Sequence, residues 1–265
     1  MEEIEPHLQL RSFFERLRSR GDGALALDYD GTLAPFQVDR DAAVPYPGVA
    51  ALIRDIQAWG RTRVVLISGR PAEEVRRLLG VEPAPEIWGA HGRQRLRPDG
   101  SSEMAEIRPA DRAALDEATT WIDGRDLRGM AEFKPGSVAL HWRGQARDQV
   151  EKLTAEAHSA FASIAERTGI ALLEFDGGIE LRPSEPNKGS AVRVLLGELE
   201  PGTPLAYLGD DTTDEDAFLA LRDTGALTVL VRSAWRETHA QCWIRPPQEL
   251  LDFLRTWLEC TGGTR

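Results

Sequence analysis

Segments of strand length alternate with segments of helical periodicity in this chain, and no other feature limits its possible folds as strongly. Apolar segments of strand length lie at 24–28, 63–67, 86–92, 204–210 and 226–231. Segments with a helical spacing of apolar residues lie at 48–59, 71–79, 187–199, 214–221 and 247–259. Strands that alternate with helices in this way pair in parallel, and the helices cover both faces of the sheet. The sequence therefore predicts an α/β fold built on a parallel sheet.

This order changes in the middle of the chain. A helical segment at 109–122 precedes two short strands within 130–144, and a second helix at 146–167 precedes two more strands within 170–183. Turn residues join each pair of strands, Pro135-Gly136 in the first and Asp176-Gly177-Gly178 in the second. We therefore expect a smaller α+β cap domain at 109–185, inserted into a core formed by 1–108 and 186–265.

The charge balance argues against two classes of partner. The chain has 43 acidic and 32 basic residues and a formal net charge of -11, whereas nucleic acids and anionic membranes bind basic surfaces.

No apolar segment is long enough to span a bilayer. The amino-terminal stretch lacks the apolar region of a signal peptide, and the two cysteines, Cys242 and Cys260, show no metal-binding spacing. We expect a cytoplasmic protein that acts on a small molecule, without nucleic acid or membrane as partner, and we expect a monomer.

Polar clusters follow the predicted strands at the ends where parallel sheets bind ligands. The clusters are Asp28 with Asp30, Ser68-Gly69-Arg70, Lys188 at a helix start, and Gly209-Asp210-Asp211 with Asp214. They lie far apart in the sequence, but a parallel sheet brings them to one edge.

The charges of these clusters indicate a bound cation and a phosphate. Carboxylates gathered at one edge repel one another unless a cation is bound or some of them are protonated. Oxygen ligands without histidine or cysteine favour Mg2+ over zinc, and magnesium uses one or two carboxylates together with a substrate phosphate. Lys188 supplies a positive charge and Ser68 a hydroxyl beside backbone amides, and both suit a phosphate. The residues together describe a phosphoryl-transfer site.

The two leading acids suit different steps of such a reaction. Asp28, at the end of its strand, is placed to attack phosphorus and form an aspartyl-phosphate. Asp30 lies two residues further on, where its side chain can turn back to protonate the leaving oxygen and then activate water. Asp210 is expected to bind the metal directly. Asp211 and Asp214 could cap the following helix, and both are expected to support the site from behind the ligands.

Four motifs resemble those of the haloacid dehalogenase superfamily of phosphatases: "DYDGTL", "SGR", "NKG" and "YLGDDTTDEDAF". Over its whole length the chain is similar to trehalose-6-phosphate phosphatases, through "EFKPGSVALHWR" and "IELRP" in the predicted cap. The resemblance implies a Rossmann-like core, a cap that closes over a sugar phosphate, and hydrolysis of trehalose 6-phosphate as the last step of trehalose biosynthesis. Trp142, where tyrosine is expected, and Arg182, where lysine is common, depart from the family's pattern.

The resemblance also implies roles for individual residues. It implies Asp28 as nucleophile, Asp30 as acid and base, and Mg2+ held by Asp28, the carbonyl of Asp30 and Asp210. The implied phosphate-binding residues are Thr32, Ser68, Gly69 and Lys188. The implied substrate-binding residues are Arg70, Glu132, Lys134, His141, Arg143 and Glu180.

Several of these residues have a plainer interpretation. The charged residues of the predicted cap could form a solvated cross-strand ladder, Arg70 could serve a helix start or act as a gate near the phosphate, and His91 in "GAHG" is typical of a turn.

The competing functions are a phosphatase of sucrose phosphate or a mannosylglycerate phosphate, and a silent regulatory domain. Decay of the catalytic motifs would favour the silent domain, but the motifs are intact.

Overall fold

A computed structural model of the protein describes residues 6–37, 39–134, 136–142, 147–175 and 177–263. It divides the chain into two compact units, Met1–Met104 with Asn187–Arg265, and Ala105–Pro186. Each unit has its own sheet and its own apolar core.

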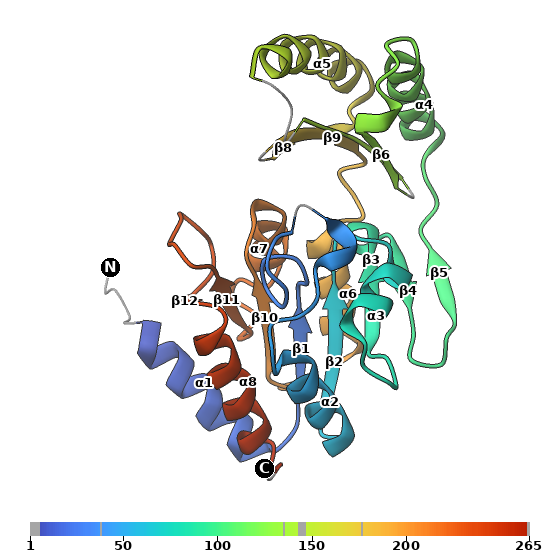
Figure 1. Cartoon of the computed structure of the whole chain (residues 1–265). Helices are drawn as coiled ribbons and strands as arrows, with labels where there is room; N and C mark the ends of the chain where they lie inside the picture. Colours follow the sequence, from blue (N-terminus) through green and yellow to red (C-terminus); the bar gives the residue numbers. More distant parts are fainter. Residues whose placement is uncertain (1–5, 38, 135, 143–146, 176, 264–265) are drawn as a thin grey trace. The chain divides into compact units, whose positions relative to one another are not determined.

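The first unit is built on an eight-stranded sheet in the order β12-β11-β10-β1-β2-β3-β4-β5 (Figure 1). The parallel strands are β1 (Gly23–Leu27), β2 (Thr62–Ile67), β3 (Glu86–Gly89), β10 (Leu205–Gly209), β11 (Leu227–Val231) and β12 (Cys242–Ile244). Two short antiparallel strands, β4 (Gln94–Leu96) and β5 (Ser102–Met104), extend one edge. The central strand β1 pairs with β2 on one side and with β10 on the other.

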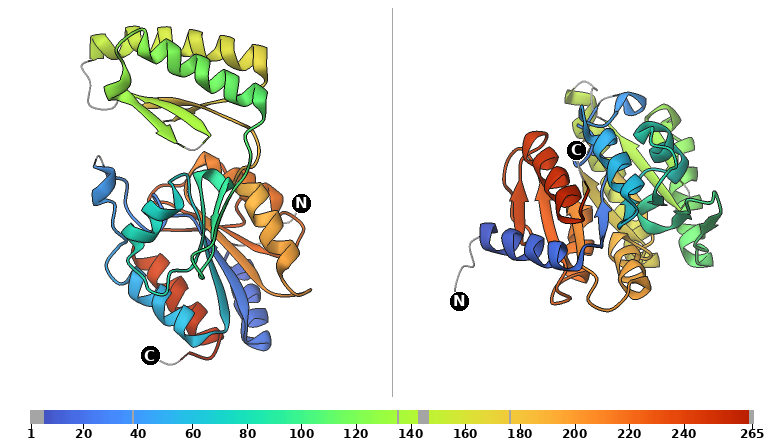
Figure 2. Two further views of the ribbon diagram at one scale, coloured as in Figure 1. Left: turned by 90° about the vertical axis from the view of Figure 1, so that its right-hand side faces the viewer. Right: turned by 90° about the horizontal axis from the view of Figure 1, so that it is seen from below.

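Helices cover both faces of this sheet, and Figure 2 shows the two layers. One face packs against α1 (Pro6–Arg20), α2 (Val49–Trp59), α3 (Ala72–Leu79) and α8 (Gln248–Cys260), and the other against α6 (Lys188–Glu198) and α7 (Glu215–Ala220). Along β1 the alternation of side chains follows this division, because Leu25 and Leu27 belong to the first core and Ala24 and Ala26 to the second. A strand buried on both faces is apolar throughout, as the sequence of β1 is.

The second unit is a four-stranded antiparallel sheet in the order β6-β7-β9-β8 with two helices. Its strands are β6 (Ala131–Lys134), β7 (Ser137–His141), β8 (Ala171–Phe175) and β9 (Gly178–Arg182), and its helices are α4 (Pro109–Asp123) and α5 (Arg147–Thr168). Val138, Leu140, Ile179 and Leu181 pack with the two helices. The alternate positions of these strands face the opposite side of the sheet and include the polar residues Ser137, His141 and Glu180.

The predicted α/β class and the parallel sheet with helices on both faces are confirmed, and the predicted segments differ from the structure at β4, β5 and β12 and at the strand expected at 86–92. Strands β4, β5 and β12 were not expected, because three-residue strands such as "QRL" and "SEM" show no clear apolar pattern. The strand expected at 86–92 ends at Gly89, because Ala90 and His91 adopt left-handed backbone angles that no strand accommodates. Among the described helices, none has the length and apolar character needed to cross a membrane.

Candidate active site

The carboxyl ends of β1, β2 and β10 and the amino end of α6 carry the polar residues that the sequence singled out. Asp28 follows β1, Ser68 follows β2, Asp210 follows β10, and Lys188 is the first residue of α6. All four side chains are buried. Because β1 lies between β2 and β10, the three strand ends are neighbours.

Lys188 links the nucleophile candidate to the last acidic motif. Its Nζ lies 2.7 Å from Oδ1 of Asp28 and 2.7 Å from Oδ1 of Asp214. The start of α6 is fixed by a capping box, in which the side chain of Asn187 accepts a hydrogen bond from the backbone of Ser190 and the Ser190 side chain bonds back. Burial lowers the pKa of Lys188, but the two carboxylates outweigh burial and raise the pKa above its ordinary value. Lys188 is therefore a fixed cation inside the site.

Asp214 organises the site through four hydrogen bonds. Its Oδ1 accepts from Lys188 and, at 2.5 Å, from the hydroxyl of Tyr207, and its Oδ2 accepts from the backbone amides of Asp210 and Asp211 at 3.0 Å each. Both oxygens are thus occupied by protein donors, so Asp214 supports Lys188 and the loop after β10. The sequence interpretation overlooked Tyr207, although a buried tyrosine usually needs a partner for its hydroxyl.

Asp211 caps the short turn that leads into the following helix, whereas the side chain of Asp214, also expected to cap that helix, makes no capping hydrogen bond to it. The Asp211 side chain accepts from the backbone amide of Thr212 and begins a short 3-10 turn, Thr212–Asp214, in a capping box completed by Asp214. Helix α7 starts directly after this turn.

Asp28, Asp210 and Asp214 form the one group of acids in the described residues that could together hold a metal ion, with one oxygen of each within 4.8 Å of the others. No donor among the described side chains contacts the Asp210 carboxylate, and burial together with Asp28 and Asp214 raises its pKa well above the ordinary value. Gly31 has a left-handed φ of 81°, and an added Cβ would overlap this carboxylate, so the Asp210 side chain lies directly against Gly31. A buried carboxylate to which no described side chain donates fits a hard cation such as Mg2+.

Asp30 is held by Arg70. The guanidinium places Nε 2.6 Å from Oδ2 and Nη2 2.7 Å from Oδ1 of Asp30, and it also bonds Glu74 and the carbonyl of Arg40. Arg70 is buried, whereas Asp30 is partly exposed. Of the two open interpretations of Arg70, a structural residue and a gate, the contacts describe a bidentate clamp on the candidate acid.

The remaining phosphate-binding candidates surround Asp28 and the end of β2. Thr32 is buried, and its hydroxyl donates to Oδ2 of Asp28 at 3.0 Å. The hydroxyl of Ser68 accepts from the backbone amide of Arg70 at 3.1 Å. Gly69 lies between them in a tight loop that leaves no room for a larger residue.

In the second unit, polar residues of three strands form one cluster on the face opposite the helices. Nε2 of His141 lies 3.1 Å from Oε2 of Glu132, and Nζ of Lys134 lies 3.5 Å from Glu132 and 3.3 Å from Oε1 of Glu180. Ser137, which the sequence interpretation missed, donates to the same Glu180 oxygen at 2.6 Å. Alternation along β7 predicts its place, since Ser137 and His141 share a face.

Glu180 is the buried centre of this cluster. Burial raises the pKa of Glu180, but Lys134 and Ser137 outweigh burial and hold the pKa below its ordinary value. Trp142, one of the departures from the family's pattern, packs against the apolar core of the unit. Arg143, also predicted to bind substrate, lies outside the described residues.

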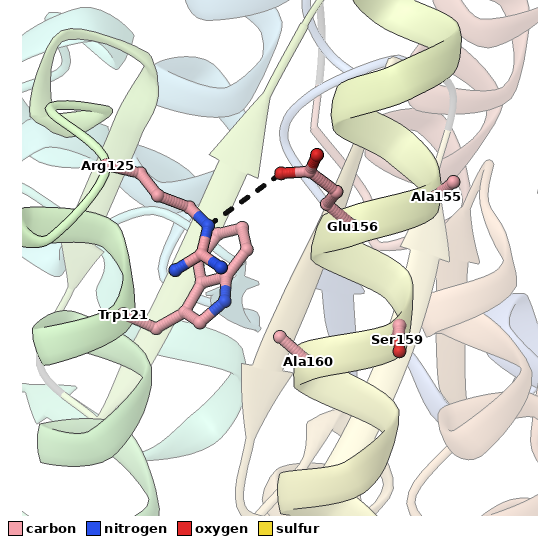
Figure 3. A pocket seen from close by; sticks show the side chains of 6 residues that line it. All are labelled: Trp121, Arg125, Ala155, Glu156, Ser159 and Ala160. Carbon is pink, nitrogen blue, oxygen red and sulfur yellow. Dashed lines mark ion pairs between the residues drawn. The ribbon is translucent and has the colours of Figure 1, made fainter.

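A separate pocket lies between α4 and α5, and Figure 3 shows its lining. The guanidinium of Arg125 lies 4.2 Å from the ring centre of Trp121 and 3.8 Å from Oε2 of Glu156. None of the predicted site residues lines this pocket.

Metal-free protein is expected to lose stability as the pH rises from about 4 to about 7. Burial raises the pKa of Asp28 from 3.8 to about 7 and that of Asp210 in the same direction, while both return to about 3.9 on unfolding. The native state therefore binds more protons in this window, and the stability that they confer is lost as the pH rises through the folded pKa. Thermal melting in EDTA at a series of pH values measures the slope of stability against pH. Asp210→Asn should flatten it, and an unchanged slope in that variant would contradict the assignment.

Comparison with known proteins identifies the family. A family model described as trehalose-phosphatase matches residues 26–242. The chain belongs to the trehalose-phosphatase family. Among curated relatives it is 34% identical over 245 residues to the trehalose-phosphate phosphatase of Mycobacterium marinum, covering 87% of this chain and 60% of that protein. It is 32% identical over 250 residues to that of Mycobacterium leprae, covering 88% and 56%. The chain thus spans less than two thirds of the length of these relatives.

Solved structures agree with this family assignment. A trehalose-6-phosphate phosphatase related protein superposes with a TM-score of 0.67 at 29% identity, over 88% of this chain and 95% of that one. The carboxyl-terminal domain of trehalose-6-phosphate phosphatase from C. albicans superposes with a TM-score of 0.78 at 20% identity, over 96% and 97%. The second likeness shows the fold of the trehalose-phosphatase family extending over nearly the whole chain.

Proposed function

We propose that this chain is a Mg2+-dependent phosphatase that hydrolyses trehalose 6-phosphate to trehalose and phosphate, the last step of trehalose biosynthesis. The observation that carries the proposal is the buried cluster in which Lys188 joins Asp28 to Asp214 beside Asp210, in a member of the trehalose-phosphatase family. Buried acids around one buried cation form a site for a phosphoryl group and a metal rather than a stabilising core.

In the first step, Asp28 attacks phosphorus. The new bond joins its carboxylate oxygen to phosphorus, the bond from phosphorus to the sugar oxygen breaks, and Asp30 donates a proton to that oxygen so that trehalose leaves. Lys188 and Thr32 orient Asp28 through its two oxygens. Both oxygens of Asp30 accept from Arg70 in the described state, so Asp30 leaves this pair before it delivers a proton.

In the second step, water attacks the aspartyl-phosphate. Asp30, now ionised, takes a proton from the water, the bond between phosphorus and the Asp28 oxygen breaks, and phosphate is released. In this proposal Lys188 balances the negative charge of the phosphoryl oxygens, and the Ser68 hydroxyl and neighbouring amides donate to them.

Asp28, Asp210 and the carbonyl of Asp30 are the residues that would hold Mg2+. When bound, the cation would neutralise charge on the phosphoryl oxygens and on the crowded carboxylates. The support for this assignment is the raised pKa of Asp210 and its position against Gly31, the residue after Asp30. Cys242 and Cys260 are buried and not joined in a disulfide, which supports our placement of the enzyme in the reducing cytoplasm.

The polar cluster of the second unit is our candidate for disaccharide binding. Glu132, Lys134, His141 and Glu180 offer acceptors and donors of the kind that sugar hydroxyls require. A solvated ladder explains Glu132 and His141 equally well, but a ladder needs no buried glutamate, and Glu180 is only 5% exposed.

Glu180→Ala is expected to raise the KM for trehalose 6-phosphate by about tenfold or more, because it removes a charged acceptor of hydroxyl groups. The KM and kcat for p-nitrophenyl phosphate, which has no sugar, should change far less. Glu174→Ala is the matched control, since Glu174 lies on the neighbouring strand and pairs with His158 of α5. Equal losses on both substrates would refute a sugar-binding role.

A substrate panel tests the proposed function against its alternatives. Phosphate release from trehalose 6-phosphate, sucrose 6-phosphate and glucose 6-phosphate, each with Mg2+ and with EDTA, should be fastest for the first substrate and depend on the metal. Absence of a preference would overturn the substrate assignment. Absence of any release would favour a silent domain, since the C-terminal domain of a trehalose synthase regulatory protein from Candida albicans has the same fold at 15% identity.

A further inference from the structure

Three consecutive residues after β3 adopt left-handed backbone angles. Ala90 has a φ of 48°, His91 of 57° and Gly92 of 96°. For residues other than glycine this conformation is strained, and such strain persists only where the surrounding structure enforces it. The strained turn lies at the same sheet edge as the candidate active site, because β3 pairs in parallel with β2.

The backbone of this turn is bonded to the loop that follows β2. The amide of Ala90 donates to the carbonyl of Arg70 at 2.7 Å, and the amide of His91 donates to the carbonyl of Ser68 at 2.9 Å. The amide of Ser68 in turn donates to the carbonyl of Trp88 at 2.8 Å. The turn and the Ser68–Arg70 loop are therefore held together on both sides of Gly69.

The side chain of His91 fills the space against Gly69. The imidazole is only 8% exposed, and a methyl group added to Gly69 would lie 2.5 Å from Cε1 and 2.7 Å from Nε2 of His91. The three nearest atoms to such a methyl all belong to this ring. The ring therefore sets how far the Gly69 backbone can move toward β3.

The other end of the turn contacts the start of α6. A methyl group on Gly92 would lie 2.6 Å from the carbonyl oxygen of Asn187, the residue before Lys188. One strained turn thus touches both the loop of Ser68 and the helix start of Lys188, which come from distant parts of the sequence.

We propose that His91 is a positioning residue for the phosphate site. By its contact with Gly69 it fixes the Ser68–Arg70 loop, and through Gly92 the same turn fixes the distance from this loop to Lys188. The inference rests on the proposed function in so far as these two elements bind the phosphoryl group. It accounts for a buried histidine in a strained conformation that the reaction itself does not use.

The test compares four variants for binding of inorganic phosphate in the presence of Mg2+ by calorimetry. His91→Gly removes the ring but tolerates the left-handed backbone, so it should fold and bind phosphate about tenfold more weakly than the parent, within the range for residues in contact. Gly69→Ala should weaken binding by a similar factor, because its methyl meets the ring. In the double variant the methyl has space, so the two losses should not multiply.

Gly197→Ala is the matched control, because an added methyl there meets no atom within 4 Å, and its phosphate affinity should equal that of the parent. His91→Asn, which also tolerates a left-handed backbone, replaces His91→Gly if the latter does not fold. Phosphate affinity of the His91 variants within twofold of the parent, or losses that multiply in the double variant, would overturn the proposal.

Amide hydrogen exchange separates this inference from the proposed function. In metal-free protein, His91→Gly should accelerate exchange at Gly69 and Arg70 about tenfold or more while the central strand β1 stays protected. If the parent protein binds no phosphate but His91→Gly still accelerates exchange in the loop, the proposed function is wrong and the positioning role stands. Unchanged exchange in the loop would remove the positioning role.

Discussion

Asp28→Asn abolishes phosphate release from trehalose 6-phosphate and leaves the protein folded. We expect a loss of kcat of about a thousandfold or more, because an amide cannot form the acyl-phosphate through which the reaction passes. The native structure should tolerate the change, since it removes one of three crowded acids while Lys188 keeps its bond to Asp214.

Steady-state phosphate release measures this loss, and thermal melting shows that the variant is folded. Asp55→Asn, an exposed position on α2, is the control and should retain the parent's activity. If Asp28→Asn kept activity within tenfold of the parent, a covalent aspartyl-phosphate at this residue would be ruled out.

Lys188→Met is expected to produce the largest loss of stability. The side chain of Lys188 is buried and is bonded to Asp28 and Asp214. Its removal leaves two buried carboxylates without their cation, which commonly costs about 3–5 kcal/mol in the free energy of unfolding. Urea denaturation in EDTA measures this difference.

Added Mg2+ should recover part of the lost stability, because a divalent cation neutralises the same carboxylates. The control is Arg193→Met on the exposed side of the same helix, which should change the unfolding free energy by less than about 1 kcal/mol. A Lys188→Met protein as stable as the parent in EDTA would show that the carboxylates do not depend on this cation.

The sheet could be predicted because its strands carry their own signal. A strand covered on both faces, such as β1, must be apolar at every position, and the polar residues that end it stand out, as Asp28 does. The short edge strands β4 and β5 are different: β4 pairs with β3 and β5 with β4, and both bury little apolar surface, so their residues carry almost no pattern.

The partners of the candidate site residues were harder to predict than their places. Parallel pairing brings Asp28, Ser68 and Asp210 to one edge whatever the details of packing. The clamp between Arg70 and Asp30 depends instead on the rotamer of a long side chain. The left-handed turn at His91 depends on contacts with a loop twenty residues earlier and a helix start about a hundred residues later, as the positions of Ser68 and Asn187 show. Tertiary contacts of this kind leave no local periodicity in the sequence.

The central place of β1 in the first unit has a consequence for synthesis of the chain. Its partner β10 lies at Leu205–Gly209, so one side of β1 has no strand to pair with until that segment has left the ribosome. The unit Ala105–Pro186 is continuous in the sequence and emerges earlier. Pairing across so long a sequence separation is slow, and an unpaired apolar strand invites association with other chains. The nascent protein therefore carries an aggregation risk in "GALAL", the strand that precedes the candidate nucleophile, until Leu205–Gly209 has been made.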